Sequence, residues 1–313
     1  MLNILGKRYY FFALSALLIV PGLIILIIDS ASGKLPLSID FTGGSLFEVR
    51  IDANPIPQPA EIIGIYHDQG ITDVQVQTTG NQTFVIRSPY MDEEQRTKIV
   101  DAIENQYAGG VVDVLRFDSV GPTIGREVTS RAASAILVAM VIVVLYIWFA
   151  FRGVPNALRL GICAIAALLH DVAIVFSLTA FGAHFLAWQI DAMLFTALLT
   201  VIGFSMQDKI VVFDRVRENT SIHRRLPFET LVNHSIVQTL QRSINTQLMT
   251  VEFMLLALAL FGGITLRNFA IVLLVGLMSG TYSSIFIAAP FLVLWENREW
   301  RTWFRKRSET VTS

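Results

Sequence analysis

Ionisable side chains lie inside long apolar runs of this sequence, where they are costly in lipid and mark ion paths or partner contacts. One run contains His170-Asp171, and a second contains Gln207-Asp208-Lys209. A third begins near Arg242 and contains Glu252. A carboxylate at such depth exchanges a proton when a neighbouring cation moves, because burial favours its neutral form and the cation favours its charged form. These residue types therefore indicate a proton relay or, equally well, a structural ion pair.

The third run places its polar residues on one helix face. Gln238, Arg242 and Asn245 are spaced i, i+4 and i+7, so they form a stripe that needs a partner surface rather than lipid. Thr246 follows directly. In the second run, Lys209 has a further interpretation, in which its long stem snorkels to the nearby cytoplasmic headgroups.

The composition excludes several classes of protein. Of the 313 residues, 53% are hydrophobic and 16% are charged, whereas soluble domains carry about 25% charged residues. The net charge of −1 argues against nucleic acid as a partner. The single cysteine, Cys163, excludes an intrachain disulfide, and the five histidines lack metal-ligand spacing, so we expect no metal site.

Six apolar runs are long enough to cross a bilayer as helices, which takes roughly 20 residues each. They are residues 11–28, 132–150, 160–180, about 192–213, about 244–261 and 269–295. The first is expected to be an uncleaved anchor rather than a signal peptide, since no cleavage site precedes Asp29. The sixth contains a stripe of small residues, which favours close helix packing within the chain or at a subunit interface. The stripe is Gly276, Gly280, Ser284 and Ala288.

Lys and Arg predict the orientation of the chain in the membrane. They gather in residues 1–10, 151–159, 214–225 and 297–313, whereas residues 181–190 contain none. Residues 1–28 are therefore expected to be a cytoplasmic N-terminus with the first helix, and residues 297–313 a basic cytoplasmic tail. The polar block 29–131 is expected to be external, and residues 132–296 to contain the other five helices.

The polar block is predicted to be one small α+β domain. The pattern predicts strands at 44–51, 72–77, 83–87 and 111–117, helices at 59–69 and 91–107, and a hairpin turn at 79–81. This βαββαβ order is typical of the ferredoxin-like fold. We interpret the carboxylates of the domain as a solvated face, so it is expected to touch a polypeptide or partner subunit rather than to catalyse. They are Asp68, Asp73, Asp92, Glu93 and Glu94.

Motifs spread over nearly the whole chain resemble the SecF proteins of the SecD/SecF family, which are protein-export membrane proteins of the bacterial Sec system. The motifs are Ile39-Asp40-Phe41-Thr42-Gly43-Gly44, Val120-Gly121-Pro122-Thr123-Ile124-Gly125, His170-Asp171-Val172, the runs 208–219 and 239–246, and Gly280-Thr281-Tyr282-Ser283-Ser284-Ile285-Phe286. Each motif is weak alone, but together, in this order and in these runs, they are specific.

The resemblance implies a multi-pass α-helical membrane protein, half of an RND-type transporter, with six transmembrane helices and one external domain between helices 1 and 2. It implies an auxiliary subunit that, with SecD, assists the SecYEG channel and the SecA motor. Such a subunit uses the proton gradient to promote preprotein translocation across the cytoplasmic membrane of a bacterium. We expect no enzymatic activity and no cofactor, with H⁺ as the coupling ion, or Na⁺ as in some relatives.

The resemblance assigns the proton relay to Asp208 and Arg242, with Asp171 as a weaker candidate. Supporting polar residues are His170, Gln207, Lys209, Asn245, Thr246 and Glu252. Most relatives have Asn and Thr where Gln207 and Lys209 stand, and a cation beside Asp208 would hold it ionised. Glu252 also replaces an apolar residue, so we consider Lys209 and Glu252 a candidate pair between antiparallel neighbouring helices.

Three rival functions are open from the sequence. An RND-like exporter of lipids or small molecules would need a twelve-span chain or a homodimer, and a substrate cleft. An intramembrane protease would need paired aspartates or a Ser-His dyad in a context that this sequence lacks. A purely structural assembly subunit would use the same polar residues only to hold SecD in place.

Overall fold

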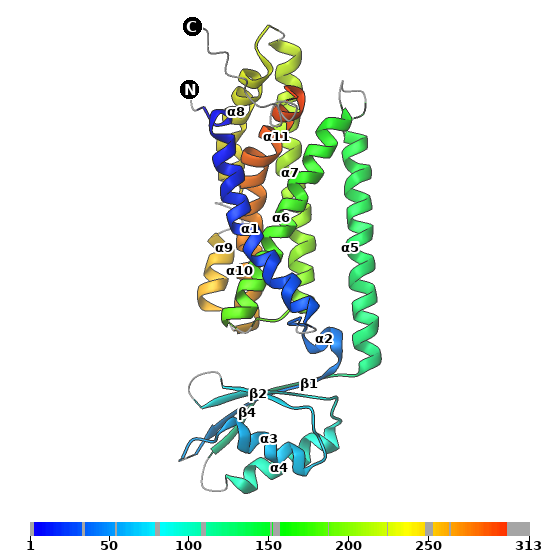
Figure 1. Cartoon of the computed structure of the whole chain (residues 1–313), viewed down its shortest axis with the longest axis vertical. Helices are drawn as coiled ribbons and strands as arrows, with labels where there is room; N and C mark the ends of the chain where they lie inside the picture. The colour runs from blue at the N-terminus through cyan, green and yellow to red at the C-terminus, as the bar shows by residue number, and fades with distance from the viewer. Residues whose placement is uncertain are drawn as a thin grey trace, which may run out of the picture. The chain divides into compact units, whose positions relative to one another are not determined.

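The computed structural model describes residues 3–32, 35–53, 55–78, 82–107, 111–150, 152, 157–186, 188–223, 225–247, 253–262 and 264–298. The chain divides into two compact units, which Figure 1 shows. The helical unit comprises Met1–Pro36, Ala135–Gln189 and Met193–Ser313, and the sheet unit comprises Leu37–Ser134 and Ile190–Ala192. The main segment of the sheet unit, Leu37–Ser134, corresponds to the polar block that was predicted to run from residue 29 to residue 131.

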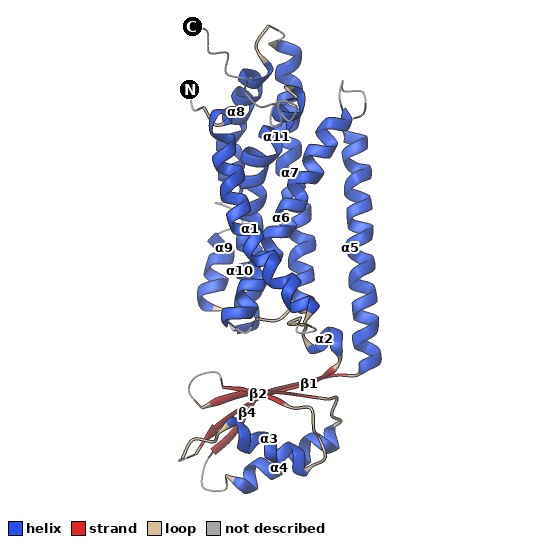
Figure 2. Cartoon of the chain, in the orientation of Figure 1, coloured by secondary structure: helices blue, strands red, loops and turns tan. Residues whose placement is uncertain are grey.

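Five helical segments in the described residues are long and apolar enough to cross a membrane (Figure 2). They are Leu5–Ala31, Pro122–Ala150, Leu158–Leu186, Ala192–Ile222 and Leu266–Glu296. These segments contain the predicted first, second, third, fourth and sixth spans. The predicted fifth span falls on the end of α8 (Phe228–Gln247), on residues 248–252 outside the described part, and on α9 (Phe253–Phe261).

The long segments are built from the helices that carry the polar residues of interest. They comprise α1 (Arg8–Ala31), α5 (Pro122–Ala150), α6 (Ala157–Leu186), α7 (Ala192–Ile222), α10 (Ile264–Ser283), the π-helical turn η3 (Ser284–Ala288) and α11 (Ala289–Glu296). Apolar side chains on α1 and α5 are largely uncovered, and Leu17 and Trp148 are each 69% exposed. Such faces need lipid or another chain around them rather than water.

Helix α1 crosses α6 at a glycine. A Cβ atom on Gly22 would lie 2.6 Å from Ser177 Cα, so only glycine fits this crossing. Ser177 Oγ donates a hydrogen bond to the carbonyl oxygen of Leu18 at 2.6 Å, which fastens the two helices together. Helix α1 is therefore held tightly against α6, the helix that carries Asp171.

The small-residue stripe of the sixth span lies against other helices of this chain. A Cβ atom on Gly280 would lie 3.1 Å from Ser205 Cα on α7, and Gly276 also meets α7 closely. Ser284 and Ala288 are fully buried. Close approach at these positions brings hydroxyl groups of α10 within reach of polar groups on α6 and α7.

The sheet unit has the predicted order of elements. These are β1 (Gly44–Asp52), α3 (Pro59–Asp68), β2 (Gln75–Thr78), β3 (Thr83–Ser88), α4 (Glu93–Gln106) and β4 (Val111–Val120). The strands form one antiparallel sheet in the order β2-β3-β1-β4. The predicted hairpin turn at 79–81 lies outside the described residues, although the strands on either side of it pair as expected.

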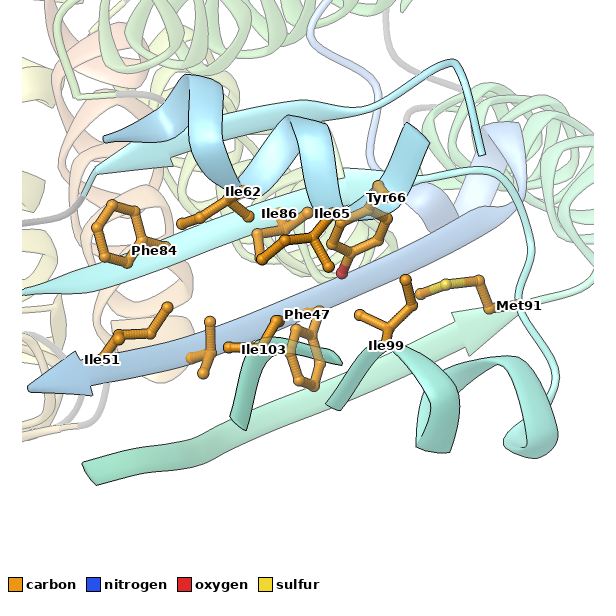
Figure 3. Close-up of a cluster of buried hydrophobic side chains, with 11 residues drawn as sticks. Phe47, Ile51, Ile62, Ile65, Tyr66, Phe84, Ile86, Met91, Ile99 and Ile103 are labelled. Carbon is orange, nitrogen blue, oxygen red and sulfur yellow. The ribbon is translucent and has the colours of Figure 1, made fainter. Parts of the chain in front are cut away.

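The core of the sheet unit lies between one face of the sheet and the helices α3 and α4 (Figure 3). Alternate residues of β1, namely Phe47, Val49 and Ile51, are at most 1% exposed. They meet apolar side chains from β3 and both helices, which include Ile62, Tyr66, Phe84, Ile86, Ile99 and Ile103. The alternation of apolar residues that predicted these strands is therefore also the alternation of their buried side chains.

The carboxylates of the sheet unit form a solvated face, as predicted. Asp68, Asp73 and Asp92 are exposed, and so are Glu93 and Glu94. Two of them make surface ion pairs along α4, and such pairs contribute little to stability. Directly after α4, burial and a hydrogen bond to Glu61 on α3 raise the pKa of Tyr107 to about 12.

Two of the motifs found in the sequence meet where the chain enters and leaves the sheet unit. Gly43 and Gly44 have φ angles of +73° and +122°. A Cβ atom on Gly43 would lie 2.9 Å from Pro122 Cα, and one on Gly125 would lie 2.8 Å from Gly43 N. A Cβ atom on Gly44 would lie 2.8 Å from the carbonyl oxygen of Ser88. The glycines therefore allow entering and leaving backbones to touch.

We predict that Gly44→Ala destabilises the sheet unit by about 2 kcal/mol or more, since backbone strain and a clash with Ser88 act together. Amide hydrogen exchange of β1 and β3 in the full chain measures the effect. The matched control is Gly70→Ala, where φ is +81° but the Cβ atom would meet nothing within 4 Å. Equal effects at both positions would show that contact with Ser88 is unimportant.

Candidate buried charge cluster

Asp171 is fully buried in a hydrogen-bonded cluster made by α6, α7 and α10. Its Oδ1 accepts hydrogen bonds from Ser279 Oγ at 2.7 Å and from His170 Nδ1 at 3.1 Å. Its Oδ2 accepts from Ser283 Oγ at 2.7 Å and also from Ser205 Oγ. Both carboxylate oxygens are thus supplied with donors, as a carboxylate requires where water is excluded.

The counter-ion of Asp171 is Lys209. Neither side chain has exposed surface, and Lys209 Nζ lies 2.7 Å from Asp171 Oδ2. The hydroxyls of Ser205 and Ser283 also accept hydrogen bonds from Nζ, so each ammonium proton has an acceptor. The snorkelling interpretation of Lys209 is therefore wrong, because its ammonium turns inward to α6. Glu252, the other candidate partner, lies outside the described residues.

A chain of hydrogen bonds leads from Asp171 to helix α1. His170 Nε2 lies 2.9 Å from Ser15 Oγ, which in turn lies 3.3 Å from the hydroxyl of Tyr282. The Tyr282 hydroxyl donates to the carbonyl oxygen of Phe11 at 2.9 Å. Each of these side chains can donate or accept a proton, so the chain connects α6 to α1 and α10 through groups suited to proton movement.

Asp208 has partners of a different kind, although it precedes Lys209 on α7. It is 6% exposed, and its Oδ2 accepts hydrogen bonds from Thr281 Oγ1 at 3.0 Å and from Gln247 Nε2 at 3.2 Å. The charge of Lys209 and, to a lesser extent, that of Arg242 act on Asp208, but no salt bridge joins either cation to it in the described part of the chain. The carboxylate is therefore buried among neutral donors with a cation close by.

The other predicted polar residues are on the exposed surface of the chain. Arg242, Asn245 and Thr246 are exposed on α8, and Gln207 is exposed on α7. Of the polar stripe of α8, Gln238 accepts hydrogen bonds from Arg215 and Asn219 on α7, whereas Arg242 and Asn245 are exposed. The buried face of α8 carries Ser243 and Gln247 instead, and for Ser243 Oγ and Gln247 Oε1 no hydrogen-bond partner occurs among the residues described. Such buried atoms are usually satisfied by water.

Helix α10 supplies hydroxyl groups to both carboxylates. Thr281 donates to Asp208, whereas Ser279 and Ser283 donate to Asp171. Directly after Ser283 the helix widens into the π-helical turn η3, and such turns occur often at functional sites. A small shift of α10 would therefore change the hydrogen bonds of both carboxylates together.

Ser205 and Ser279 were not among the predicted site residues, and Ser283 stood only within the 280–286 motif, although a signal for these serines exists. Ser205 and Lys209 are spaced i, i+4 on α7, and Ser279 and Ser283 have the same spacing on α10. Each pair therefore lies on one helix face. Serines inside apolar helices commonly bond to their own backbone, so spacing alone does not single them out. Within the described ranges, no group of three His, Cys, Asp or Glu side chains could hold a metal ion.

Comparison with known families gives matches over most of the chain. Residues 100–298 match the family model described as protein export membrane protein SecD/SecF, C-terminal, and residues 32–54 match the SecD/SecF GG motif. The chain is 60% identical to a protein translocase subunit SecF of Anaerolinea thermophila over the full length of both chains. It is 42% identical to a protein translocase subunit SecF of Thermobaculum terrenum, covering 98% of each chain.

Longer relatives and a solved structure match in the same way. A protein translocase subunit SecDF of Thermus thermophilus is 37% identical over 83% of this chain and 34% of its own length. The crystal structure of SecDF, a translocon-associated membrane protein from the same organism, superposes with a TM-score of 0.77 at 34% identity. That match covers 95% of this chain but 39% of the solved chain.

Proposed function

Because the chain belongs to the SecD/SecF family of protein-export membrane proteins, we propose that it is a proton-driven auxiliary subunit of the Sec translocase. Relatives in which a SecDF chain contains the matching segment imply SecD as its partner. It assists the SecYEG channel and the SecA motor. With SecD, it promotes the movement of a preprotein that emerges from the channel. It has no catalytic step and no cofactor of its own.

We further infer the topology that this role needs. The fifth span predicted from the sequence, about residues 244–261, gives six transmembrane helices and the half-transporter arrangement of RND proteins. The βαββαβ unit is a ferredoxin-like external domain, supported by its order of elements and strands. Both termini are cytoplasmic in the cytoplasmic membrane of a bacterium, as the distribution of Lys and Arg predicts.

The single observation that carries the proton mechanism is the environment of Asp208. Neutral donors hold its carboxylate, while the charges of Lys209 and Arg242 act on it without a salt bridge. A change in the distance from Asp208 to either cation would therefore shift the balance between its two protonation states. Water bonded to Ser243 and Gln247 would give the proton a path to this carboxylate.

The energy available from the proton gradient is sufficient for such a switch. Moving one charge through about 150 mV releases about 3.5 kcal/mol, which biases a two-state equilibrium by more than a hundredfold. Helix α10 is the element that would change state, because its hydroxyls bond both buried carboxylates. We assign Asp171 the lesser role in this step, since its protonation would break the ion pair with Lys209.

We predict that Asp208→Asn abolishes the stimulation of preprotein translocation by the proton gradient, while assembly with SecD is retained. Asparagine can keep both hydrogen bonds of this site but cannot exchange the proton. Translocation into membrane vesicles, measured with and without a proton gradient, checks the first part, and co-purification with SecD checks the second.

The control is Asp113→Asn, which removes an exposed carboxylate that pairs with Arg50 on the sheet unit. This variant should retain gradient-stimulated translocation. Loss of the SecD complex in Asp208→Asn would favour the purely structural subunit. Full gradient stimulation in Asp208→Asn would exclude Asp208 from the relay.

A further inference from the structure

The oxygen atoms around Lys209 Nζ form a cage of the kind that holds a small cation. Nζ lies 2.7 Å from Asp171 Oδ2, 3.0 Å from Ser283 Oγ and 3.4 Å from the carbonyl oxygen of Ser205, whose hydroxyl it also contacts. Carboxylate, hydroxyl and carbonyl oxygens are the ligands that hard cations prefer. We propose that Lys209 is a tethered cation that fills a Na⁺ site and keeps Na⁺ away from Asp171.

The charge of the cage determines which cation fits it. Asp171 is the one carboxylate that contacts Nζ among the side chains described, so one positive charge balances the cage. A divalent ion would leave an uncompensated positive charge where both side chains have no exposed surface, and this is strongly unfavourable. The cage is therefore matched to a monovalent cation.

The ligands would stay in place if the amine were removed. They come from α6, α7 and α10, so the packing of the helices positions them rather than Lys209 itself. Ser279 on α10 holds the far oxygen of Asp171 at 2.7 Å, and the close crossing of Gly280 over Ser205 fixes α10 against α7. A short polar residue at position 209 would leave room for an ion among these oxygens.

The test is Na⁺ binding to purified full-length Lys209→Thr in detergent, with choline chloride as the salt control at equal ionic strength. We expect Na⁺ to raise the Tm of this variant by on the order of 5 °C and to leave the Tm of the wild type unchanged. Direct binding of radioactive Na⁺ should approach one ion per chain.

Two matched variants locate the ion. Lys209→Met fills the same space without a charge or a ligand atom. Lys209→Thr combined with Asp171→Asn leaves the space open but removes the carboxylate. The Tm of neither variant should respond to Na⁺. A Na⁺ response in either variant, or none in Lys209→Thr, would overturn the proposal. Failure of Lys209→Thr to fold in NaCl would also contradict it, because Na⁺ should replace the amine. Equilibrium binding needs no SecD and no gradient, so its failure would leave the proton mechanism intact.

Discussion

Asp171→Asn should destabilise the helical unit by about 3–5 kcal/mol, which makes it the most damaging single substitution that we expect in the membrane helices. The variant leaves the Lys209 ammonium without a counter-ion, where its side chain has no exposed surface. Serine hydroxyls remain around Nζ, but they cannot neutralise its charge. Thermal unfolding of the detergent-solubilised chain should show a Tm lower by on the order of 10 °C.

A second substitution should reverse most of this loss. Asp171→Asn combined with Lys209→Met removes both charges, and replacing a buried ion pair by uncharged groups of similar volume is often nearly neutral. Asp214→Asn is the control for charge removal alone, because its pair with Arg217 is exposed and should contribute at most about 1 kcal/mol. If the double variant were no more stable than Asp171→Asn, the damage would not come from the unpaired ammonium.

Phe47→Ala should destabilise the sheet unit by about 3–5 kcal/mol, because it opens a cavity in the middle of that core. Phe47 is 1% exposed and packs edge-to-face against Phe117, with ring centroids 5.9 Å apart. Its strand is central in the sheet, between β3 and β4, so the loss affects pairing on both sides. The backbone cannot close the gap without moving these strands.

Amide hydrogen exchange of β1, β3 and β4 in the full chain measures this effect. A loss of about 3 kcal/mol corresponds to exchange that is roughly a hundredfold faster for amides exposed by unfolding of the unit. Tyr90→Ala removes an aromatic side chain of similar size that is 49% exposed, and it should change exchange little. Equal acceleration in the two variants would mean that the loss of an aromatic ring, not its burial, causes the effect.

The sheet unit was predictable to the extent that local patterns determine it. Alternation identified the strands, but it placed the start of β2 at residue 72 rather than at Gln75. Gln75 pairs with Arg87 near the end of β3. If β2 began earlier, its first residues would lie opposite the last residue of β3 and then Pro89, which has no N–H to donate. Alternation also predicted that β4 ends at residue 117, which is too early. The strand continues to Val120 because Val120 pairs with Gly44, which a local pattern cannot show.

Hydropathy located five of the six predicted spans in the described residues, but not the full helices. The second span was predicted from residue 132, whereas α5 begins at Pro122, a residue suited to the first position of a helix. The intervening residues are too polar to register as a membrane span. The ionisable residues of the candidate site were also visible in the sequence. The pairing of Lys209 with Asp171 was not, because it depends on the rotation of α7 against α6, and nothing in either segment alone determines that.

The contact between Gly43 and Pro122 makes the sheet unit an insertion in the topological sense. Its first strand residue, Gly44, pairs with its last, Val120, so the two ends of the inserted segment lie side by side. A short linker between them could replace residues 44–120 without stretching the chain. Domains that are attached in this way can be exchanged between relatives as modules, while the helices that flank them keep their connection.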